Sequence, residues 1–301
     1  MPAERRQLFK LFAGVSIGVV AISFAAIFIK FCDDVPSIMI ATYRLTISSI
    51  ILLLITKARG TRFSALTGRQ VLIGALGGLF LSLHFSLWIW SLKLTSVASS
   101  VVLVTTNPIF VGLFSYLFFK EKQPPEVIAG IALSFCGSFI LAVGDSGLRG
   151  LAIENTSFLL GDALALLGAV MASGYFMVGS KLRVEMDILS YTSVVYTFSA
   201  CFLLLTSLCS RIPFTGYKAG SYLFMLLLAV VPQLIGHTAI NWALRHLRTS
   251  MIAITILGEP IGASILAYII FSETIGSFQG VGIALIFLAI IVASRKGIKA
   301  L

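Results

Sequence analysis

Thr106-Asn107-Pro108-Ile109 lies midway along one apolar run, and Gly258-Glu259-Pro260-Ile261 lies midway along another. Both runs are long enough to cross a bilayer, and each carries a polar residue directly before its proline. The two stretches are 152 residues apart, and other residues repeat at the same offset: Trp90 and Trp242, Tyr116 and Tyr268, Glu121 and Glu273, and Gly130-Ile131-Ala132-Leu133 and Gly282-Ile283-Ala284-Leu285. The chain is therefore built from two copies of one unit.

The composition indicates a membrane protein. Of 301 residues, 58% are hydrophobic and 11% are charged, and the mean hydropathy is +1.03, whereas soluble proteins carry about 25% charged residues. Each copy contains five apolar runs of the length that a membrane helix needs. We predict an all-α polytopic protein with ten transmembrane helices, at residues 11–30, 35–56, 69–90, 95–119, 124–143, 157–180, 188–210, 219–240, 249–271 and 277–294.

The first run is predicted to stay in the protein as a membrane span. Arg5, Arg6 and Lys10 precede it, as basic residues precede the core of a signal peptide. The run from Leu11 to Ile29 is longer than the 7 to 15 residues of such a core, and nine more runs follow.

Lysine and arginine predict the orientation. With a cytoplasmic N-terminus, sixteen basic residues fall on the inside and five on the outside. Cytoplasmic loops are enriched in Lys and Arg, so we predict that both termini are cytoplasmic. The same rule accounts for the net charge of +10, and no nucleic-acid partner is predicted. The outside residues are Lys30, Lys93, Arg149, Arg211 and Lys218.

Five spans in each copy is an odd number, so the second copy is expected to be inverted in the membrane. The predicted units are residues 1–143, an external linker at 144–156, and residues 157–301. Inverted repeats with a site near the membrane midplane are a recurring plan of secondary transporters.

Several motifs resemble the EamA repeat of the drug/metabolite transporter superfamily. They are Thr95-Ser96-Val97-Ala98-Ser99-Ser100, the Asn107-Pro108 kink followed by Glu121, Leu257-Gly258-Glu259-Pro260-Ile261-Gly262, and Ile40-Ala41-Thr42-Tyr43-Arg44. The resemblance covers essentially the whole chain. It implies ten spans, an inverted pair of five-helix repeats, and alternating access of a central cavity in a cell membrane such as the bacterial inner membrane. Members carry amino acids, nucleotide-linked compounds and other metabolites.

Pro108 and Pro260 are the first candidate site residues. Proline lacks the backbone N–H and its ring clashes with the preceding turn, so each is expected to kink its helix. The freed carbonyls of Val104 and Ile256 are tolerated where they face protein or a water-filled cavity. The two kinks are interpreted as hinges of a substrate site, and static packing kinks are the alternative.

Glu259 and Arg44 are charged residues near the middle of predicted spans, where an unpaired charge is costly. Glu259 is interpreted as a proton carrier or as a structural carboxylate, and its counterpart Asn107 cannot titrate. Three roles are open for Arg44. It could pair with Glu259, bind a substrate carboxylate or phosphate through its planar fork, or tie helix ends together.

Aromatic and amide side chains complete the predicted site. His84 and Trp88 share one helix face, and so do His237 and Asn241, because residues four apart are neighbours on a helix. Tyr175 lies in the sixth span and is the remaining candidate. Packing roles inside the helix bundle are the alternative for all five residues.

Three carboxylates are predicted to lie outside the site. Asp33 and Asp34 are expected to be solvated in an external loop. Asp162 is expected to stabilise the start of the sixth span through a cap or the helix dipole.

No catalytic pattern is visible, and neither a metal nor a cofactor is predicted. The sequence has no glycine-rich phosphate loop and no cluster at metal-ligand spacing. The four cysteines are interpreted as packing residues.

The predicted function is secondary transport, by export, of small polar metabolites such as amino acids, with proton coupling or facilitated exchange as open modes. The alternatives are an exchanger or uniporter of nucleotide-linked metabolites and a lipid flippase. A monomer and a homodimer are both compatible with the sequence.

Overall fold

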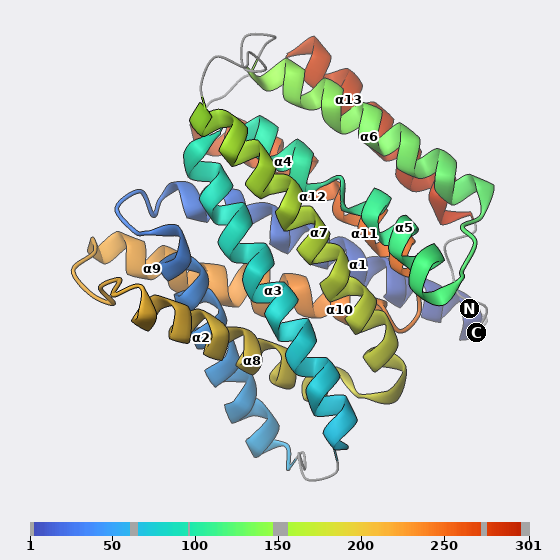
Figure 1. Cartoon of the computed structure of the whole chain (residues 1–301). Coiled ribbons are helices and arrows are strands. Elements are labelled where there is room, and N and C mark those ends of the chain that lie inside the picture. The colour runs from blue at the N-terminus through green and yellow to red at the C-terminus, as the bar shows by residue number, and fades with distance from the viewer. Residues whose placement is uncertain (1–2, 61–65, 96, 147–155, 272–275, 296–301) are drawn as a thin grey trace.

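The computed structural model describes residues 3–60, 66–95, 97–146, 156–271 and 276–295 (Figure 1). Helices are the only regular elements within these ranges. Some features of the sequence lie outside them: Arg62, Ser96, Arg149, residues 147–155 of the predicted linker, Glu273, Lys296 and Lys299.

The first copy of the repeat comprises six helices. They are α1 (Ala3–Lys30), α2 (Ser37–Ala58), α3 (Gly68–Leu94), α4 (Val97–Val104), α5 (Asn107–Phe119) and α6 (Pro125–Ser146). Local sequence sets several of their ends. Thr67 and Gln70 form a reciprocal capping box at the start of α3. Lys120 ends α5 in the left-handed conformation, with φ of 55°.

The second copy follows the same order with one irregular helix. It comprises α7 (Thr156–Glu185), α8 (Ile188–Cys209), α9 (Ala219–Leu228), the π-helix η3 (Ala229–His237), α10 (Thr238–Ala243), α11 (Thr249–Ile256), α12 (Gly258–Phe271) and α13 (Ser277–Ser294). Pro232 lies inside η3 and cannot donate to an α-helical ladder. The segments α9, η3 and α10 together occupy the predicted eighth span.

Every predicted span coincides with a helix or with consecutive helices. Seven helical segments within the described ranges are long and apolar enough to cross a membrane, and three shorter apolar helices lie at Asn107–Phe118, Pro125–Gly137 and Gly280–Ala293. Helix length and composition therefore account for seven of the ten predicted spans. The largest boundary differences are in α1, which begins at Ala3 instead of near 11, and in α7, which continues to Glu185 instead of ending near 180.

Both predicted proline kinks are complete breaks in the helix. The chain leaves the α-helix at Thr105 and Thr106 before Asn107, and at Leu257 before Gly258. The amides of Thr106 and Leu257 bond three residues back, to Leu103 and Ile254.

The main contacts that helices of the first copy make have counterparts made by the corresponding helices of the second copy. In the first copy, α3 packs on α7 and α8; in the second, η3 packs on α1 and α2. Likewise α4 and α5 pack on α7, while α11 and α12 pack on α1. The helices α2 and α8 pack on each other, and so do α6 and α13. This pattern is the one that a two-fold relation between the copies produces.

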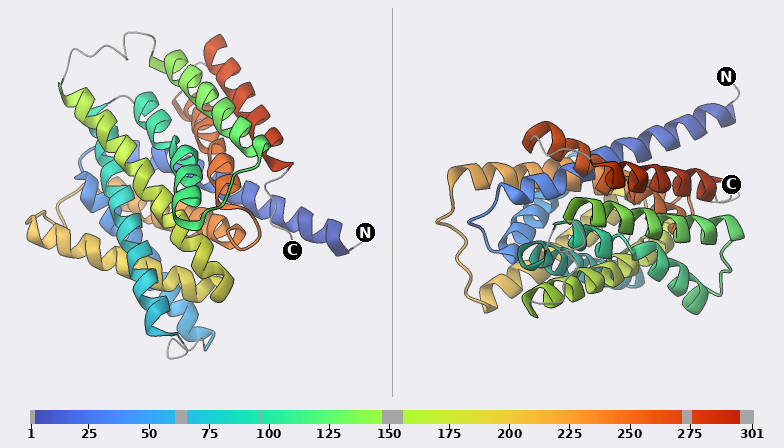
Figure 2. Two further views of the ribbon diagram at one scale, coloured as in Figure 1. Left: turned by 45° about the vertical axis from the view of Figure 1, so that its right-hand side comes forward. Right: turned by 90° about the horizontal axis from the view of Figure 1, so that it is seen from above.

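The α6–α13 pair lies side by side along one flank of the molecule in both views of Figure 2. Glycines allow the two backbones to approach closely. A Cβ atom on Gly137 would lie 2.9 Å from the carbonyl oxygen of Gly282, and one on Gly130 would lie 2.8 Å from the Cβ of Ala293. Small residues serve the same purpose in many membrane helix pairs.

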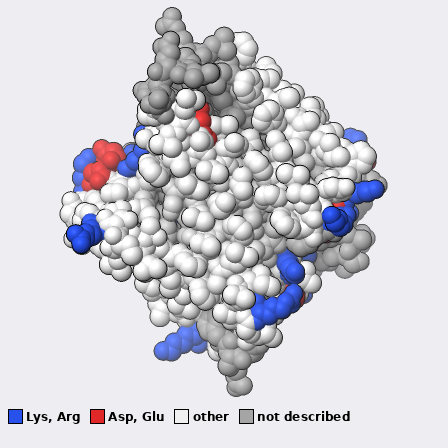
Figure 3. Space-filling model, viewed as in Figure 1, with Lys and Arg blue, Asp and Glu red and all other residues white. Residues whose placement is uncertain are grey.

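Charged residues gather at the edges of the face in Figure 3, and a broad uncharged band crosses it.

The expectation that Asp33 and Asp34 are merely solvated is wrong. Asp33 pairs with the Lys218 ammonium at 3.0 Å, and Asp34 accepts hydrogen bonds from the Lys218 amide and the Ser221 hydroxyl. These contacts join the loop between α1 and α2 to the start of α9.

Asp162 also differs from its expected role. Its carboxylate accepts a hydrogen bond of 2.7 Å from the Thr95 hydroxyl, so it links the start of α7 to the end of α3. A residue distant in sequence is the partner, and it could not be read from the residues around Asp162.

Candidate functional site

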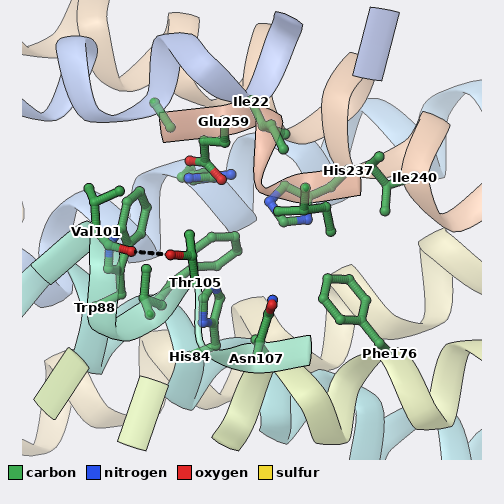
Figure 4. Close-up of a pocket in the computed structure, with 16 residues that line it drawn as sticks. Ile22, His84, Trp88, Val101, Thr105, Asn107, Phe176, His237, Ile240 and Glu259 are labelled. Carbon is green, nitrogen blue, oxygen red and sulfur yellow. Dashed lines mark hydrogen bonds between the residues drawn. The ribbon is translucent and has the colours of Figure 1, made fainter. Parts of the chain in front are cut away.

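A cavity of about 40 Å³ lies where the broken helices meet α1, α2, α3 and α7. Asn107 is the first residue of α5 and Glu259 is the second residue of α12. Figure 4 shows these two side chains entering the cavity from opposite sides. Sixteen residues line it: Ile22, Ala25, Arg44, His84, Phe85, Trp88, Val101, Val104, Thr105, Asn107, Ala172, Phe176, His237, Ile240, Ile256 and Glu259.

Six of the ten predicted site residues line this cavity, namely Arg44, His84, Trp88, Asn107, His237 and Glu259. Pro108 and Pro260 are buried and each directly follows a lining residue. Tyr175 and Asn241 are buried in a neighbouring polar network and do not line the cavity.

Arg44 is fully buried, with none of its surface exposed. Its Nε donates to the side-chain oxygen of Gln233 at 2.8 Å, and its guanidinium carbon lies 3.9 Å from the centre of the Phe85 ring. Nη1 and Nη2 have no hydrogen-bond partner among the described residues. Gln233 therefore binds one edge of the guanidinium and Phe85 packs on one face. Its outer fork, which consists of Nη1 and Nη2, is available to a ligand.

Glu259 is half-buried in the first turn of α12. The partial positive charge of a helix N-terminus stabilises a carboxylate at this position. Arg44 and Glu259 line the same cavity, but the Nη atoms of Arg44 form no hydrogen bond to Glu259. The direct ion pair between Arg44 and Glu259, one of the three predicted roles of Arg44, is not formed in this conformation.

Aromatic rings form one wall of the cavity. The Phe85 ring lies edge-on to His237, with centroids 5.3 Å apart, and the His84 ring stacks parallel to Trp88 at 6.1 Å. His84 is oriented by a 3.0 Å contact between its Nδ1 and the carbonyl of Gly168.

Buried polar atoms without a partner point to a ligand at the cavity. Within the described part of the chain, three residues of the lining have side-chain atoms without a hydrogen-bond partner, namely Trp88 Nε1, Asn107 Oδ1 and His237 Nδ1. Almost all buried polar groups in proteins are hydrogen-bonded, so a cluster of unsatisfied atoms requires an explanation. These atoms offer both donors and acceptors to a small polar molecule or to water.

Tyr175 and Asn241 belong to a polar network beside the cavity. Asn241 Nδ2 donates to the Tyr175 hydroxyl and lies 3.5 Å from that of Tyr196. The Tyr196 hydroxyl in turn lies 3.5 Å from the backbone oxygen of Gln233, the residue that holds Arg44.

The network continues to the end of α7. Arg183, which the sequence placed in a cytoplasmic loop, is only 2% exposed because α7 is longer than predicted. Its Nε donates to the backbone oxygen of Asn241 at 3.1 Å, and its Nη1 donates to that of Met186. Hydrogen bonds therefore lead from Arg44 at the cavity to the loop between α7 and α8.

Sequence reasoning missed Gln233, Phe85 and Tyr196. The Pro232-Gln233 dipeptide within an apolar run was a usable signal for Gln233, because it combines a helix breaker with an amide inside a span. Phe85 and Tyr196 carried no such signal, because aromatic residues are common in membrane helices. No group of three His, Cys, Asp or Glu residues in the described ranges could hold a metal ion.

Comparison with known proteins agrees with this architecture. The EamA-like transporter family matches residues 11–143 and again residues 159–295. An uncharacterized transporter of Clostridium kluyveri is 26% identical over 78% of this chain and 76% of its own. The uncharacterized transporter YetK of Bacillus subtilis is 24% identical over 88% of this chain and 80% of its own.

More distant similarities extend to animals and to a solved fold. Mouse solute carrier family 35 member G1 is 26% identical over 55% of this chain and 46% of its own. One crystal structure superposes with a TM-score of 0.78 at 18% identity, over 96% of this chain and 98% of that one. The predicted resemblance is confirmed, and the chain belongs to the EamA-like transporter family, whose members are membrane transporters and not enzymes.

Proposed function

We propose that the protein is a secondary transporter that exports a small zwitterionic metabolite, such as an amino acid, by alternating access. The observation that carries this proposal is the outer fork of Arg44. A fully buried guanidinium faces a closed cavity with two nitrogens unpartnered among the described residues. A buried charge without a partner is costly, and a planar fork suits a carboxylate.

Other residues that line the cavity complement the remaining groups of such a solute. Glu259 offers a carboxylate to an ammonium group, and the Phe85, His84 and Trp88 rings supply an apolar and aromatic wall. Asn107 adds a side-chain oxygen without a partner among the described residues. A solute whose carboxylate binds Arg44 and whose ammonium group binds Glu259 would neutralise the charges of both side chains.

The cavity size supports a transport cycle with a closed intermediate. About 40 Å³ holds one or two water molecules, whereas small-molecule sites are typically about 300 Å³ or more. The helices must therefore separate to admit the solute. The breaks before Pro108 and Pro260 are the proposed hinges, because the half-helices on either side share few backbone hydrogen bonds.

Contacts close the bundle at both ends. On the side of α9, Asp33 and Asp34 bind Lys218 and Ser221, and Lys93 donates to the backbone oxygen of Val35. On the side where α7 ends, Arg183 binds the backbone of α10. Alternating access requires these two sets of contacts to open in turn.

The topology is part of the proposal. Ten spans would form two inverted five-helix repeats, residues 1–143 and 157–301, joined by an external linker at 144–156. Both termini would be cytoplasmic and the protein would lie in the cell membrane as a monomer or homodimer. The positive-inside count and the exchange of helix contacts between the copies support this arrangement.

Uptake into proteoliposomes tests the proposal. Labelled amino acids are added with and without a pH gradient, and accumulation that requires intact Arg44 is the expected result. Acceleration by the gradient indicates proton coupling, with Glu259 as the proposed carrier. Transport stimulated only by solute on the opposite side indicates exchange.

Failure of every amino acid would overturn the proposed solute class. Nucleotide-linked metabolites and lipids are then the next substrates to test, as an exchanger and a flippase respectively. Both are larger than the closed cavity, so they require a wider opening of the same hinges.

A further inference from the structure

A second and larger hollow lies between α3, α5 and α7, away from the polar cavity. Its volume is about 460 Å³. Its walls are apolar except at one end, where Lys181 lies. The lining residues are Ile73, Leu76 and Phe80 of α3, Phe114 and Phe118 of α5, and Val170, Gly174, Met177, Val178 and Lys181 of α7.

This hollow, called the groove below, lies beside α5, whose residues differ from those of its counterpart α12. In the second copy, α12 packs tightly on α1 through Gly258 and Gly262, where added Cβ atoms would lie 2.7 Å and 2.1 Å from side-chain atoms of α1. The corresponding residues of α5 and the turn before it are Thr106 and Phe110, which carry larger side chains.

The dimensions of the groove match one leaflet of a bilayer. Val170 and Lys181 are eleven residues apart on α7, which corresponds to about 16 Å along a helix. Half of the hydrocarbon core is about 15 Å. Lys181 is exposed at the end of the groove, so a lipid whose acyl chain fills the groove would bring its headgroup to this lysine.

We propose that this groove binds one acyl chain of an anionic phospholipid, whose phosphate lies at Lys181. The walls supply apolar contact and, apart from Lys181, no charged group, which suits an acyl chain and not a zwitterionic solute. Further basic residues lie where neighbouring helices begin or end. Lys120 and Lys122 follow α5, whereas Arg69, in the first turn of α3, is paired with Glu185 at 3.4 Å. Basic residues near a membrane surface attract anionic headgroups.

The lipid site is independent of the proposed solute, because the groove shares no lining residue with the polar cavity.

Native mass spectrometry of the purified protein tests the site. The protein is titrated with phosphatidylglycerol or with phosphatidylcholine that carries the same acyl chains. Leu76→Trp fills the groove, and Leu72→Trp is the matched control, since Leu72 is on the same helix but 72% exposed and outside the groove. Lys181→Gln removes the headgroup charge, and Lys57→Gln removes an exposed lysine at the end of α2.

One tightly held phosphatidylglycerol is expected in the parent protein. Leu76→Trp should weaken it at least about tenfold, because losing the contacts of two methylene groups already has that effect. Lys181→Gln should weaken phosphatidylglycerol about fivefold and leave phosphatidylcholine unchanged. Both controls should bind as the parent does.

Two results would overturn the proposal. One is equal binding by Leu76→Trp and Leu72→Trp. The other is a Lys181→Gln variant that retains the parental preference for phosphatidylglycerol. Melting curves identify a misfolded Leu76→Trp protein, and Ile73→Trp then replaces it as the filling variant. Solute uptake can fail while the lipid binds, so the two proposals are tested separately.

Discussion

Replacing Arg44 by methionine is expected to separate solute binding from folding. If Arg44 is a ligand for the solute, its removal should abolish binding and leave the fold intact. Two charge-assisted hydrogen bonds from the fork contribute about 1.5–3 kcal/mol each, so the variant should bind at least about 100-fold more weakly.

The stability change follows from the contacts of the guanidinium. Arg44→Met loses the hydrogen bond to Gln233 and the contact with Phe85. The side-chain oxygen of Gln233 is then unpaired, which costs about 1–3 kcal/mol. It also removes a buried ion, whose desolvation costs several kcal/mol. These effects oppose each other, so the melting temperature should change by only a few degrees. The double variant Arg44→Met/Gln233→Leu should be at least as stable as the parent.

Arg183→Met is the matched control, because Arg183 is also buried but donates to two backbone oxygens. Its loss removes a buried ion, as Arg44→Met does, but it orphans two acceptors instead of one, so Arg183→Met should destabilise the protein by about 1–3 kcal/mol more than Arg44→Met does. Thermal unfolding in detergent and calorimetric titration with the solute measure the two effects. An Arg44→Met protein that binds solute normally but unfolds as readily as Arg183→Met would refute the ligand role and indicate a structural one.

Three further results are expected. Glu259→Gln should remove the dependence of uptake on a pH gradient, and an unchanged gradient effect would exclude Glu259 as the proton carrier. Pro260→Ala should restore a backbone hydrogen bond at the hinge and slow turnover about tenfold with unchanged solute affinity, whereas an unchanged rate would indicate a static kink. Hydrogen bonds from the Ser221 hydroxyl and the Lys218 amide hold the pKa of Asp34 below its ordinary 3.8. Its tie to α9 should therefore persist above pH 4 and be lost only as the pH falls through that lowered pKa, which hydrogen exchange of the Lys218 and Ser221 amides can follow.

The asymmetry between the two copies has a physical basis in a few residues. Asn107 and Glu259 occupy corresponding breaks and line the same cavity, but only Glu259 can carry a charge. Likewise, Gly258 and Gly262 allow a close contact of α12 with α1, whereas the corresponding residues of the first copy are Thr106 and Phe110. A symmetric scaffold therefore presents chemically different halves to the cavity.

The sequence by itself determined the helices, the repeat and the membrane setting. Apolar runs of fixed length require helices in a bilayer, and each proline removes one backbone donor from the helix in which it lies. Both are local properties of the chain, which explains why the positions of Pro108 and Pro260 and six of the cavity residues could be predicted.

Only the tertiary structure decided which polar groups meet. Arg44 and Gln233 are 189 residues apart and bond across two helices, and Arg183 is buried because α10 brings a carbonyl to it. The same holds for Tyr175 and Asn241, which pair with each other beside the cavity. Hydrogen-bond partners in a helix bundle depend on how the helices rotate and pack, and no local pattern in one helix encodes the face of another.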